Sequence, residues 1–184
     1  RERGWWGDDT LHGLLASNAK QYPDTLAVAD QPNRSDLTGD EPCRLSFTEL
    51  DAASDQLACQ LLDRGISTGD RVIVQLPNIV ELVVCYMAFS KIGAIISPVP
   101  VQYGSHELQH ISATISPVAI VTLNRFGALE LAKTAESITN GSVQLLVFGT
   151  DLNITSTLDP EKCLQVRSHQ DRYPTGADHI LTIS

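Results

Sequence analysis

The sequence predicts an α/β fold in which helices cover both faces of a parallel β-sheet. Short apolar runs with strand character alternate along the chain with longer segments of helical spacing. The strand-like runs are apolar throughout, which is typical of strands buried on both faces. Glycine and proline separate the segments. Repeated strand–helix–strand units of this kind form parallel sheets through right-handed crossovers.

The first part of the chain predicts a helix, a short strand and a loop. We expect the helix from Thr10 to Tyr22, with Thr10 as its N-cap and Pro23 as its stop. The short strand is expected over residues 25–29. Residues 31–42 are polar and carry turn formers at both ends, so we expect an exposed loop there.

The clearest helix is expected over residues 46–65. Ser46 and Glu49 have the spacing of a capping box, in which each side chain satisfies the free backbone amide of the other residue. Gly65 ends the helix at a position that requires a positive φ. Apolar residues recur within it at helical intervals, namely Phe47, Leu50, Leu57, Leu61 and Leu62.

A strand, a helix and a second strand are expected next. Residues 71–76 predict a buried strand. A helix then opens at Asn78, which has capping-box spacing with Glu81, and it ends at Gly93. This helix is apolar almost all round and should therefore be buried on most sides. Residues 94–99 predict the strand that follows.

Two further helix–strand units follow with weaker patterns. We expect helices over residues 105–116 and 127–138, and strands over residues 118–123 and 143–148. The first of these helices is ended by a proline, which cannot continue it. These units complete a sheet whose strands alternate with helices along the chain.

The C-terminal part of the sequence loses this regular pattern. Residues 150–176 are rich in Asp, Asn, Ser, Thr, Pro and Gly, and predict an irregular, linker-like segment. A final strand is expected over residues 179–183, directly before Ser184. A buried strand is an unusual place for a natural C-terminus, so we expect the chain to be part of a longer protein.

Composition and charge exclude several classes of function. The net charge of −9 arises from 13 Lys and Arg against 22 Asp and Glu. Such a field repels nucleic acid and anionic membrane surfaces. The longest apolar run, residues 79–96, is interrupted by charged residues, so no membrane span is expected. The N-terminal residues lack the apolar stretch of a signal peptide. We therefore expect a cytoplasmic protein without a nucleic-acid partner.

The cysteines indicate a reducing compartment. They are scattered through the sequence and form no CxxC pair. Two of them, Cys59 and Cys85, fall within apolar helical patterns and are expected to be core residues. The others are Cys43 and Cys163.

One string resembles a zinc motif. His106 and His110 enclose a glutamate in the order HExxH, in which two histidines can bind zinc while the glutamate acts as a base. Helical spacing argues against this use, because Leu108 marks the inward face and the histidines then point to solvent. We predict no metal site, and a zinc hydrolase is the least favoured hypothesis.

Other catalytic motifs are absent from the sequence. It contains no G-x-x-x-x-G-K-[ST] phosphate loop, no G-x-G-x-x-G dinucleotide fingerprint and no G-x-S-x-G nucleophile elbow. No catalytic residue is therefore assigned from motifs.

Two sequence blocks resemble the adenylate-forming enzymes. Residues 45–78 (LSFTELDAASDQLACQLLDRGISTGDRVIVQLPN) resemble the opening of that family, and residues 5–30 resemble its lead-in. Residues 81–100 (ELVVCYMAFSKIGAIISPVP) resemble its second conserved segment. The family comprises acyl- and aryl-CoA synthetases, adenylation domains of peptide synthetases, and luciferase. The matching positions are scaffold positions by their physical roles, namely Lys91, Gly93, Ala94 and Pro98.

The resemblance implies that residues 1–184 are the N-terminal portion of the AMP-binding domain, ending before its phosphate loop. In the family, that Ser/Thr/Gly-rich loop grips the ATP phosphates, and the adenine site, a ribose-binding Asp and a C-terminal Lys follow it. None of these lies in this sequence. Residues 179–184 (HILTIS) resemble the strand that leads into the loop. Ser184 would be the first serine of the loop and is the one candidate cofactor-binding residue.

The function implied for the full-length protein is that of an ATP-dependent acyl-CoA synthetase. Such an enzyme uses ATP, Mg²⁺ and CoA to convert a carboxylic acid to an acyl-adenylate and then to a thioester. The overall pattern of residues is most similar to that of synthetases whose substrate is a short-chain, medium-chain or alicyclic acid. The partner of this chain would be the rest of the same polypeptide. We expect the 184-residue chain alone to be inactive and to hold no cofactor.

Two alternatives stay open. An aryl-acid AMP ligase that loads a carrier protein is favoured by the Arg-Glu-x-Gly-Trp-Trp lead-in and by the run at 74–78, which also resemble that branch. A non-catalytic α/β binding module could use the same scaffold without its chemistry.

Overall fold

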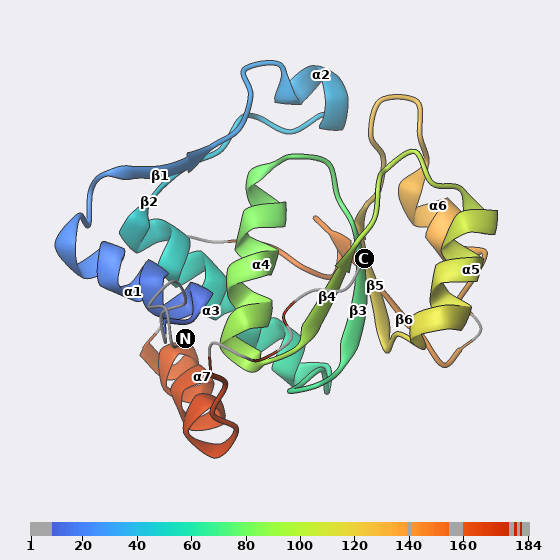
Figure 1. Ribbon diagram of the computed structural model, residues 1–184. Helices are drawn as coiled ribbons and strands as arrows, with labels where there is room; N and C mark the ends of the chain where they lie inside the picture. The colour runs from blue at the N-terminus through green and yellow to red at the C-terminus, as the bar shows by residue number, and fades with distance from the viewer. Residues whose placement is uncertain (1–8, 140, 155–159, 177–178, 180, 182–184) are drawn as a thin grey trace, which may run out of the picture.

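The computed structural model describes residues 9–139, 141–154, 160–176, 179 and 181. Helices and strands alternate along most of the chain (Figure 1). Their bounds are α1 Leu11–Gln21, β1 Leu26–Ala29, α2 Arg34–Thr38, β2 Arg44–Ser46, α3 Phe47–Asp63, β3 Arg71–Gln75, α4 Val80–Ile92, β4 Ile95–Pro98, α5 Ser105–Ile115, β5 Ala119–Leu123, α6 Leu131–Glu136, β6 Gln144–Phe148 and α7 Pro160–Arg172.

The main sheet has four parallel strands in the order β4-β3-β5-β6, which confirms the predicted fold class. The chain moves from β3 to β4 in one direction, and from β4 through β5 to β6 in the other. Because each crossover is right-handed, this reversal places the helices before and after β4 on opposite faces. Strands β1 and β2 pair separately in an antiparallel ribbon.

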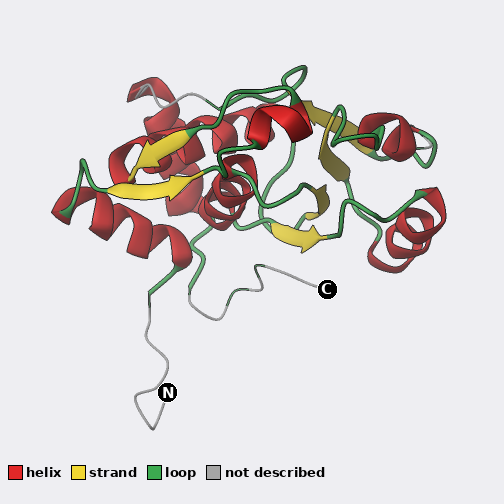
Figure 2. Cartoon of the chain, turned by 90° about the horizontal axis from the view of Figure 1, so that it is seen from above, coloured by secondary structure: helices red, strands yellow, loops and turns green. Residues whose placement is uncertain are grey.

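Each face of the sheet has its own apolar core. The larger core joins α3 and α4 to one face, and its fully buried side chains include Leu57, Phe89 and Ile96. The smaller core contains Ile73 and Leu108 and lies under α5 and α6. Seen from above, the helices lie on two opposite sides of the strands (Figure 2). The prediction of helices on both faces is therefore confirmed.

Helix α3 follows the prediction closely. The side chain of Ser46 accepts a hydrogen bond from the Glu49 amide at 3.3 Å, and the Glu49 carboxylate accepts one from the Ser46 amide at 2.8 Å. This is the predicted capping box. Gly65 has the positive φ expected after a helix, at 81°. Thr10 caps α1 as predicted, accepting a hydrogen bond from the Gly13 amide.

Helix α4 begins differently from the prediction. Its N-cap is Ile79, whose side chain makes no capping hydrogen bond, so the predicted Asn78–Glu81 capping box is wrong. The carboxylate of Asp30 instead accepts a hydrogen bond from the Val80 amide at 2.8 Å. The end of the helix is as predicted, because Gly93 has a φ of 70°. The helix start is therefore capped by a side chain from the β1–α2 connection.

Three further expectations are corrected by the structure. Residues 31–42, expected to be an exposed loop, contain α2 with its buried Arg34. Helix α6 is shorter than the predicted 127–138, because Phe126 and Leu129 form a local bridge that closes a turn before it. Residues 150–176, expected to be irregular, contain the 13-residue helix α7. Val166 of α7 is buried against α3 and α4.

The buried cysteines are placed as expected. Cys59 of α3 and Cys85 of α4 are 1% and 0% exposed, respectively. Burial, followed by the charge of Glu81, raises the pKa of the Cys85 thiol well above its ordinary value. Among the described residues, Cys43 and Cys85 are free thiols.

The predicted strand at 179–183 lies mostly outside the described residues. His179 and Leu181 are described, and neither belongs to a strand. Both nevertheless contact the region around β4, which is an edge strand of the sheet. The Ile96 amide donates to the Leu181 carbonyl at 2.7 Å, and His179 Nε2 lies 2.7 Å from the Gly93 carbonyl oxygen. In the described part of the chain, no helix has the length and apolar character to cross a bilayer.

Candidate functional site

The candidate site lies at the carboxyl ends of the parallel strands. In open α/β sheets, ligands bind in the crevice outside these ends, where neighbouring strands send their connections in opposite directions. Here the connection after β3 leads toward β4, and the connection after β5 leads toward β6. The reversal point is therefore between Gln75, which ends β3, and Leu123, which ends β5.

Gln75 is a buried polar residue at this reversal point. Its amide nitrogen donates to the carbonyl oxygens of Pro100 and Tyr103, at 3.2 and 2.8 Å, and so holds the loop after β4. Its Oε1 is buried without a hydrogen-bond partner. Thr122 of β5 donates to the Gln75 carbonyl at 3.1 Å. The carboxyl ends of β3 and β5 are thus joined by side-chain hydrogen bonds as well as by the ladder.

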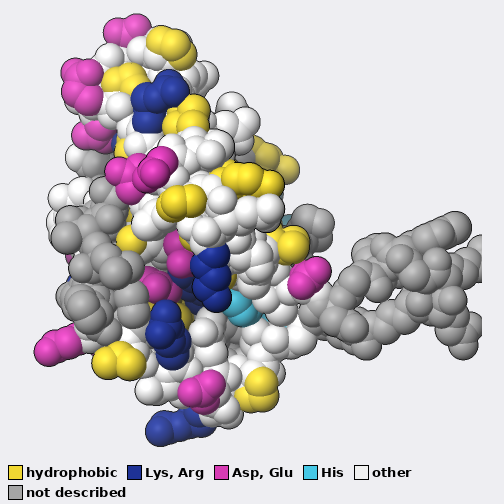
Figure 3. All heavy atoms as spheres, turned by 90° about the vertical axis from the view of Figure 1, so that its left-hand side faces the viewer, with side chains coloured by type: hydrophobic (Ala, Val, Ile, Leu, Met, Phe, Trp, Pro, Cys, Tyr) yellow, Lys and Arg dark blue, Asp and Glu magenta, His cyan; other side chains and the backbone are white. Residues whose placement is uncertain are grey.

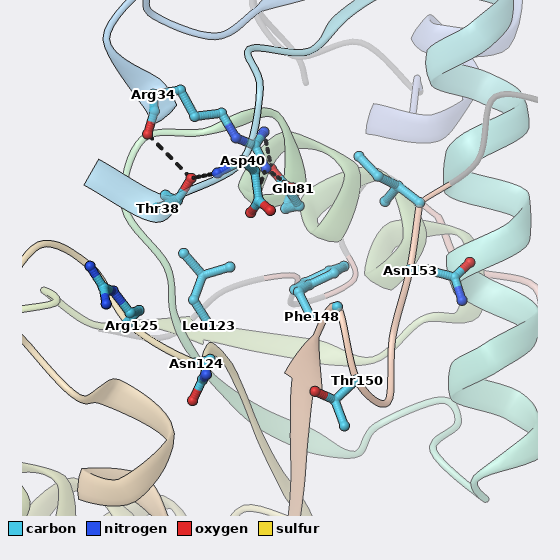
Figure 4. Close-up of a pocket in the computed structure, with 12 residues that line it drawn as sticks. Arg34, Thr38, Asp40, Glu81, Leu123, Asn124, Arg125, Phe148, Thr150 and Asn153 are labelled. Carbon is cyan, nitrogen blue, oxygen red and sulfur yellow. Dashed lines mark hydrogen bonds and ion pairs between the residues drawn. The ribbon is translucent and has the colours of Figure 1, made fainter. Parts of the chain in front are cut away.

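A cavity of about 480 Å³ opens beside the reversal point. Its floor includes Leu123 and Phe148, the last residues of β5 and β6, which point toward Asp40 and Glu81 (Figure 4). The segment after β1 and the first turn of α4 supply the facing wall. The rim is polar and is formed by Asn124, Arg125, Thr150 and Asn153.

Arg34 anchors this wall. Its guanidinium forms hydrogen bonds with both oxygens of Glu81, at 3.0 and 2.5 Å, and with Asp30 at 2.5 Å. The side chains of Arg34 and Asp30 are 5% and 0% exposed. Burial alone would lower the pKa of Arg34, but the hydrogen bonds and charges of Glu81 and Asp30 outweigh it and raise the pKa. The guanidinium is therefore a fixed cation that ties α2 to α4.

A backbone contact completes the attachment of α2. The Gly127 amide donates to the Leu37 carbonyl at 2.6 Å and so connects α2 to the loop after β5. Helix α2 is thereby held over the ends of the strands from two sides. The segment that the sequence indicated as a loop is in fact part of the site wall.

The lining of the cavity suits binding better than catalysis. The lining residues include no His, Cys, Ser or Lys, and the two carboxylates that could act as bases, Asp40 and Glu81, are ion-paired with Arg34. The lining contains two cations, Arg34 and Arg125, and two carboxylates, Asp40 and Glu81, so its formal charges balance. In the part of the chain that the structure describes, Arg125 forms no salt bridge and is exposed at the rim. The cavity can accept a group with an apolar body and a polar or anionic end.

The histidines of the HExxH string point to solvent. His106 and His110 are exposed on α5, whereas Leu108 is buried, as the helical spacing predicted. The carboxylate of Glu107 accepts a hydrogen bond from the Gly104 amide at 3.0 Å, which caps the start of α5. Backbone hydrogen bonds, from Glu107 itself and then from Gly104, lower the pKa of this glutamate. Among the described residues, no three His, Cys, Asp or Glu side chains are close enough to hold a metal ion.

Ser184, the candidate cofactor-binding residue, lies outside the described residues. Of the four positions that match the family pattern, Lys91 has a specific role in the structure. Its side chain is 5% exposed, and its ammonium forms ion pairs with Asp51 and Asp55 of α3, at 2.7 and 2.6 Å. This ties α4 to α3 and makes Lys91 a scaffold residue, as its position near a helix end suggested.

His12 lies next to this ion-pair cluster. Its Nδ1 is 2.9 Å from the Ser90 hydroxyl, and its Nε2 is 3.2 Å from the Thr10 hydroxyl. Burial lowers the pKa of His12 below its ordinary value of 6.5, and the Lys91 charge lowers it further. The opposing influences of Ser90 and the two aspartates are smaller.

This shift predicts a specific pH dependence of stability. Well above its ordinary pKa of 6.5, His12 is neutral in both the folded and the unfolded state and has no effect on stability. As the pH falls through that value, the unfolded chain binds a proton that the folded chain does not, so stability falls until the pH is below the lowered pKa. We expect His12→Gln to lose less stability between pH 7 and pH 5 than the unmodified chain, by urea unfolding. Equal losses would contradict this assignment.

Arg34 and Asp30 are the site residues that sequence reasoning missed. Their spacing of four residues, with opposite charges, was the available signal. The sequence contains no sign that the pair continues to Glu81 on another element.

Charged side chains of both signs are interspersed on the face formed by the left-hand side of Figure 1, so that face offers no basic patch for nucleic acid (Figure 3).

The fold and the position of the cavity define an open α/β sheet with a binding crevice at its carboxyl edge. The chain belongs to the AMP-binding enzyme family, whose model matches residues 15–184. This confirms the resemblance read from the two sequence blocks.

The relatives include both aryl-acid and acyl-CoA ligases. Salicyl-AMP ligase / salicyl-S-ArCP synthetase of Mycobacterium tuberculosis is 36% identical over 121 residues, which are 66% of this chain and 20% of that protein. The medium-chain fatty-acid–CoA ligase of Escherichia coli is 35% identical over 108 residues, which are 59% of this chain and 18% of that protein. The chain thus spans about a fifth of the length of these curated relatives.

Solved structures agree with the fold. The apo structure of MbtA from Mycobacterium smegmatis is 30% identical with a TM-score of 0.66, covering 80% of this chain and 26% of that one. The N-terminal domain of FACL13 from Mycobacterium tuberculosis has a TM-score of 0.70 at 19% identity, covering 95% of this chain and 41% of that one. The second likeness supports the fold alone.

Proposed function

We propose that this chain is the N-terminal part of an ATP-dependent ligase that activates a carboxylic acid as an acyl-adenylate and transfers the acyl group to CoA. The observation that carries the proposal is the family match over residues 15–184. Activation replaces a poor leaving group with AMP, so the enzyme mainly has to position the reactants and stabilise charge. The relative from Escherichia coli named as a medium-chain fatty-acid–CoA ligase supports CoA as the acceptor.

The chain supplies scaffold and not chemistry in this proposal. The cavity lining contains no His, Cys, Ser or Lys, its carboxylates Asp40 and Glu81 are ion-paired with Arg34, and no cluster of three metal-ligating side chains occurs among the described residues. The described residues do not fit ATP and Mg²⁺, because they contain no phosphate-binding loop. No step of the reaction is therefore assigned to a residue of this chain. Its sheet would form one wall of the active-site cleft, with the phosphate loop following Ser184.

An aryl acid with a carrier-protein acceptor is the second candidate. It is favoured by the relative named as a salicyl-AMP ligase, at 36% identity, and by the apo MbtA structure, at 30% identity. The two candidates share the adenylation half-reaction. They differ in the acid and in the thiol that receives the acyl group.

The proposal predicts activity for the complete reading frame and none for this chain alone. We expect the complete protein to catalyse carboxylate-dependent exchange between ATP and pyrophosphate, and the purified 184-residue chain to show only background. Salicylate-type acids and medium-chain fatty acids should be compared in parallel. Formation of acyl-CoA supports the first candidate, whereas loading of a phosphopantetheinylated carrier protein supports the second. Exchange by the short chain, or no exchange by the complete protein with either acid class, would refute the proposal.

A further inference from the structure

Two histidines lie one helical turn apart on the solvent face of α5. His106 and His110 are both exposed, whereas Leu108 between them is 0% exposed. Residues four apart in a helix lie on the same face, with Cβ atoms about 5–6 Å from each other. Two imidazole rings with this spacing can ligate one metal ion.

Helix α5 is a rigid support for this pair. Its inner face packs on the smaller core through Leu108 and Ile115. Glu107 caps its first turn, and the Arg71 guanidinium donates to the carbonyls of Ile115 and Ser116 at its end. The backbone that carries both rings is therefore ordered before an ion binds, so binding requires little further ordering of the chain.

The other three histidines have hydrogen-bonding partners within the fold. His12 contacts the Ser90 hydroxyl at 2.9 Å, and His169 and His179 contact backbone carbonyl oxygens at the end of α4, at 3.0 and 2.7 Å. All three are partly buried. A hydrated ion therefore reaches the pair on α5 more readily than it reaches these rings.

The charges near the pair act in opposite directions on a cation. The N-terminal end of α5 carries a partial positive charge, which disfavours a cation. Glu107 opposes this effect, because the backbone hydrogen bonds that lower its pKa keep its carboxylate ionised beside His106. The net charge of −9 also attracts cations to the molecule. The helix end is thus offset by a negative charge in the same turn.

We propose that His106 and His110 form a two-histidine site for a divalent transition metal ion on the surface of α5. Neutral imidazole is a common ligand of Ni²⁺, Cu²⁺ and Zn²⁺. The sequence argument against a catalytic zinc site was that the histidines face solvent, and the same exposure opens both rings to an ion. The site shares no residue with the cavity at the carboxyl edge, so the proposed function does not depend on it.

Titration of the 184-residue chain with Ni²⁺ at pH 7.5, followed by calorimetry, tests the site. We expect one ion to bind per chain. His106→Ala and His110→Ala should each weaken binding by at least about tenfold, because the second ring no longer holds the ion. Both positions are exposed, so neither change should disturb the fold. Binding should be lost at pH 5, because a protonated imidazole cannot ligate a metal.

The double variant His110→Ala/Ala113→His is the matched control. It keeps the number of histidines and moves one of them to an exposed position seven residues from His106. About 10 Å of helix then separates the two residues, and both side chains lean toward the helix N-terminus, so they cannot converge on one ion. We expect this variant to bind Ni²⁺ as weakly as His110→Ala.

Nuclear magnetic resonance locates the ion. Because Ni²⁺ is paramagnetic, it broadens the signals of nearby nuclei. At a low ratio of Ni²⁺ to protein, the ring signals of His106 and His110 should broaden first. The rings of His12, His169 and His179 serve as internal controls in the same spectrum.

Four results would overturn the proposal. They are an absence of binding by the unmodified chain at millimolar Ni²⁺, full affinity in both alanine variants, full affinity in the double variant, and earlier broadening of any of the three internal histidines. Each of them would leave the proposed ligase function untouched, because the complete protein is tested by its exchange of ATP with pyrophosphate.

Discussion

Replacing Glu81 with alanine is expected to destabilise the chain by about 3 kcal/mol, because the Arg34 guanidinium stays buried and loses its bidentate partner, keeping only Asp30 and the more distant, exposed Asp40. Arg34 is 4% exposed, so water cannot replace the hydrogen bonds lost with Glu81 unless α2 moves. Urea unfolding followed by circular dichroism at neutral pH measures the loss. The amide of Gly127, which donates to α2, should also exchange faster.

A double variant distinguishes the loss of the ion pair from the loss of side-chain packing. In Arg34→Met/Glu81→Leu, apolar side chains of similar volume replace this ion pair, and the buried Asp30 carboxylate keeps the hydrogen bonds that the Cys43 and Val80 amides donate. We expect this variant to be more stable than Glu81→Ala, since apolar replacement of a buried ion pair is often neutral or stabilising. A double variant as unstable as the single one would show that the charges themselves are not the reason for the loss.

Replacing Phe89 with alanine is expected to cost about 3–5 kcal/mol, the usual loss for a buried aromatic side chain. Phe89 is 0% exposed, and it belongs to the core that joins α3 and α4 to the sheet. The surrounding side chains come from several elements and can collapse only partly into the space. The loss should appear as a lower urea midpoint with an unchanged slope.

Phe89→Leu is the matched control for this prediction. Leucine keeps most of the volume and apolar surface, so it should cost clearly less than alanine. If both variants lose the same stability, the effect comes from the aromatic ring or the backbone and not from the cavity. Met87 of the same helix is only partly buried, and its replacement by alanine should cost less than that of Phe89.

Local signals were sufficient for much of the fold. The ends of α3 and α4 were predicted because glycine occupies positions with φ of 81° and 70°, which other residues rarely adopt. The four parallel strands were predicted because each is an apolar run that separates two helical patterns. In both cases the deciding residues are neighbours in the sequence.

The errors arose where distant residues decide the local structure. Asn78 and Glu81 have capping-box spacing, but the partner of Glu81 is Arg34, which is 47 positions away. Helix α7 has a polar sequence, and contacts with distant elements hold it. The Cys59 thiol donates to the Lys162 carbonyl, Gln165 donates to Asp63, and His169 contacts the Ile92 carbonyl. Spacing within a segment cannot reveal such partners.

The candidate site was the least predictable part. The strand ends that line it were predicted, but its wall is α2, which was expected to be a loop. Arg34 became a site residue only because the fold brings it to Glu81 and Asp30. Ser184, the residue that the family resemblance favoured, lies outside the described residues.

Because Cys85 is buried, its reaction with thiol reagents can report opening of the larger core. Thiol reagents attack the thiolate, and the raised pKa and complete burial of Cys85 suppress both the thiolate and access to it. A reagent can therefore modify this cysteine only in molecules whose larger core has opened. Cys43 is only partly buried, so a reagent should reach it more readily than Cys85, although burial and the charge of Asp30 raise the pKa of its thiol too. The labelling rate of Cys85, compared with that of Cys43, therefore reports how often the larger core opens in the native state.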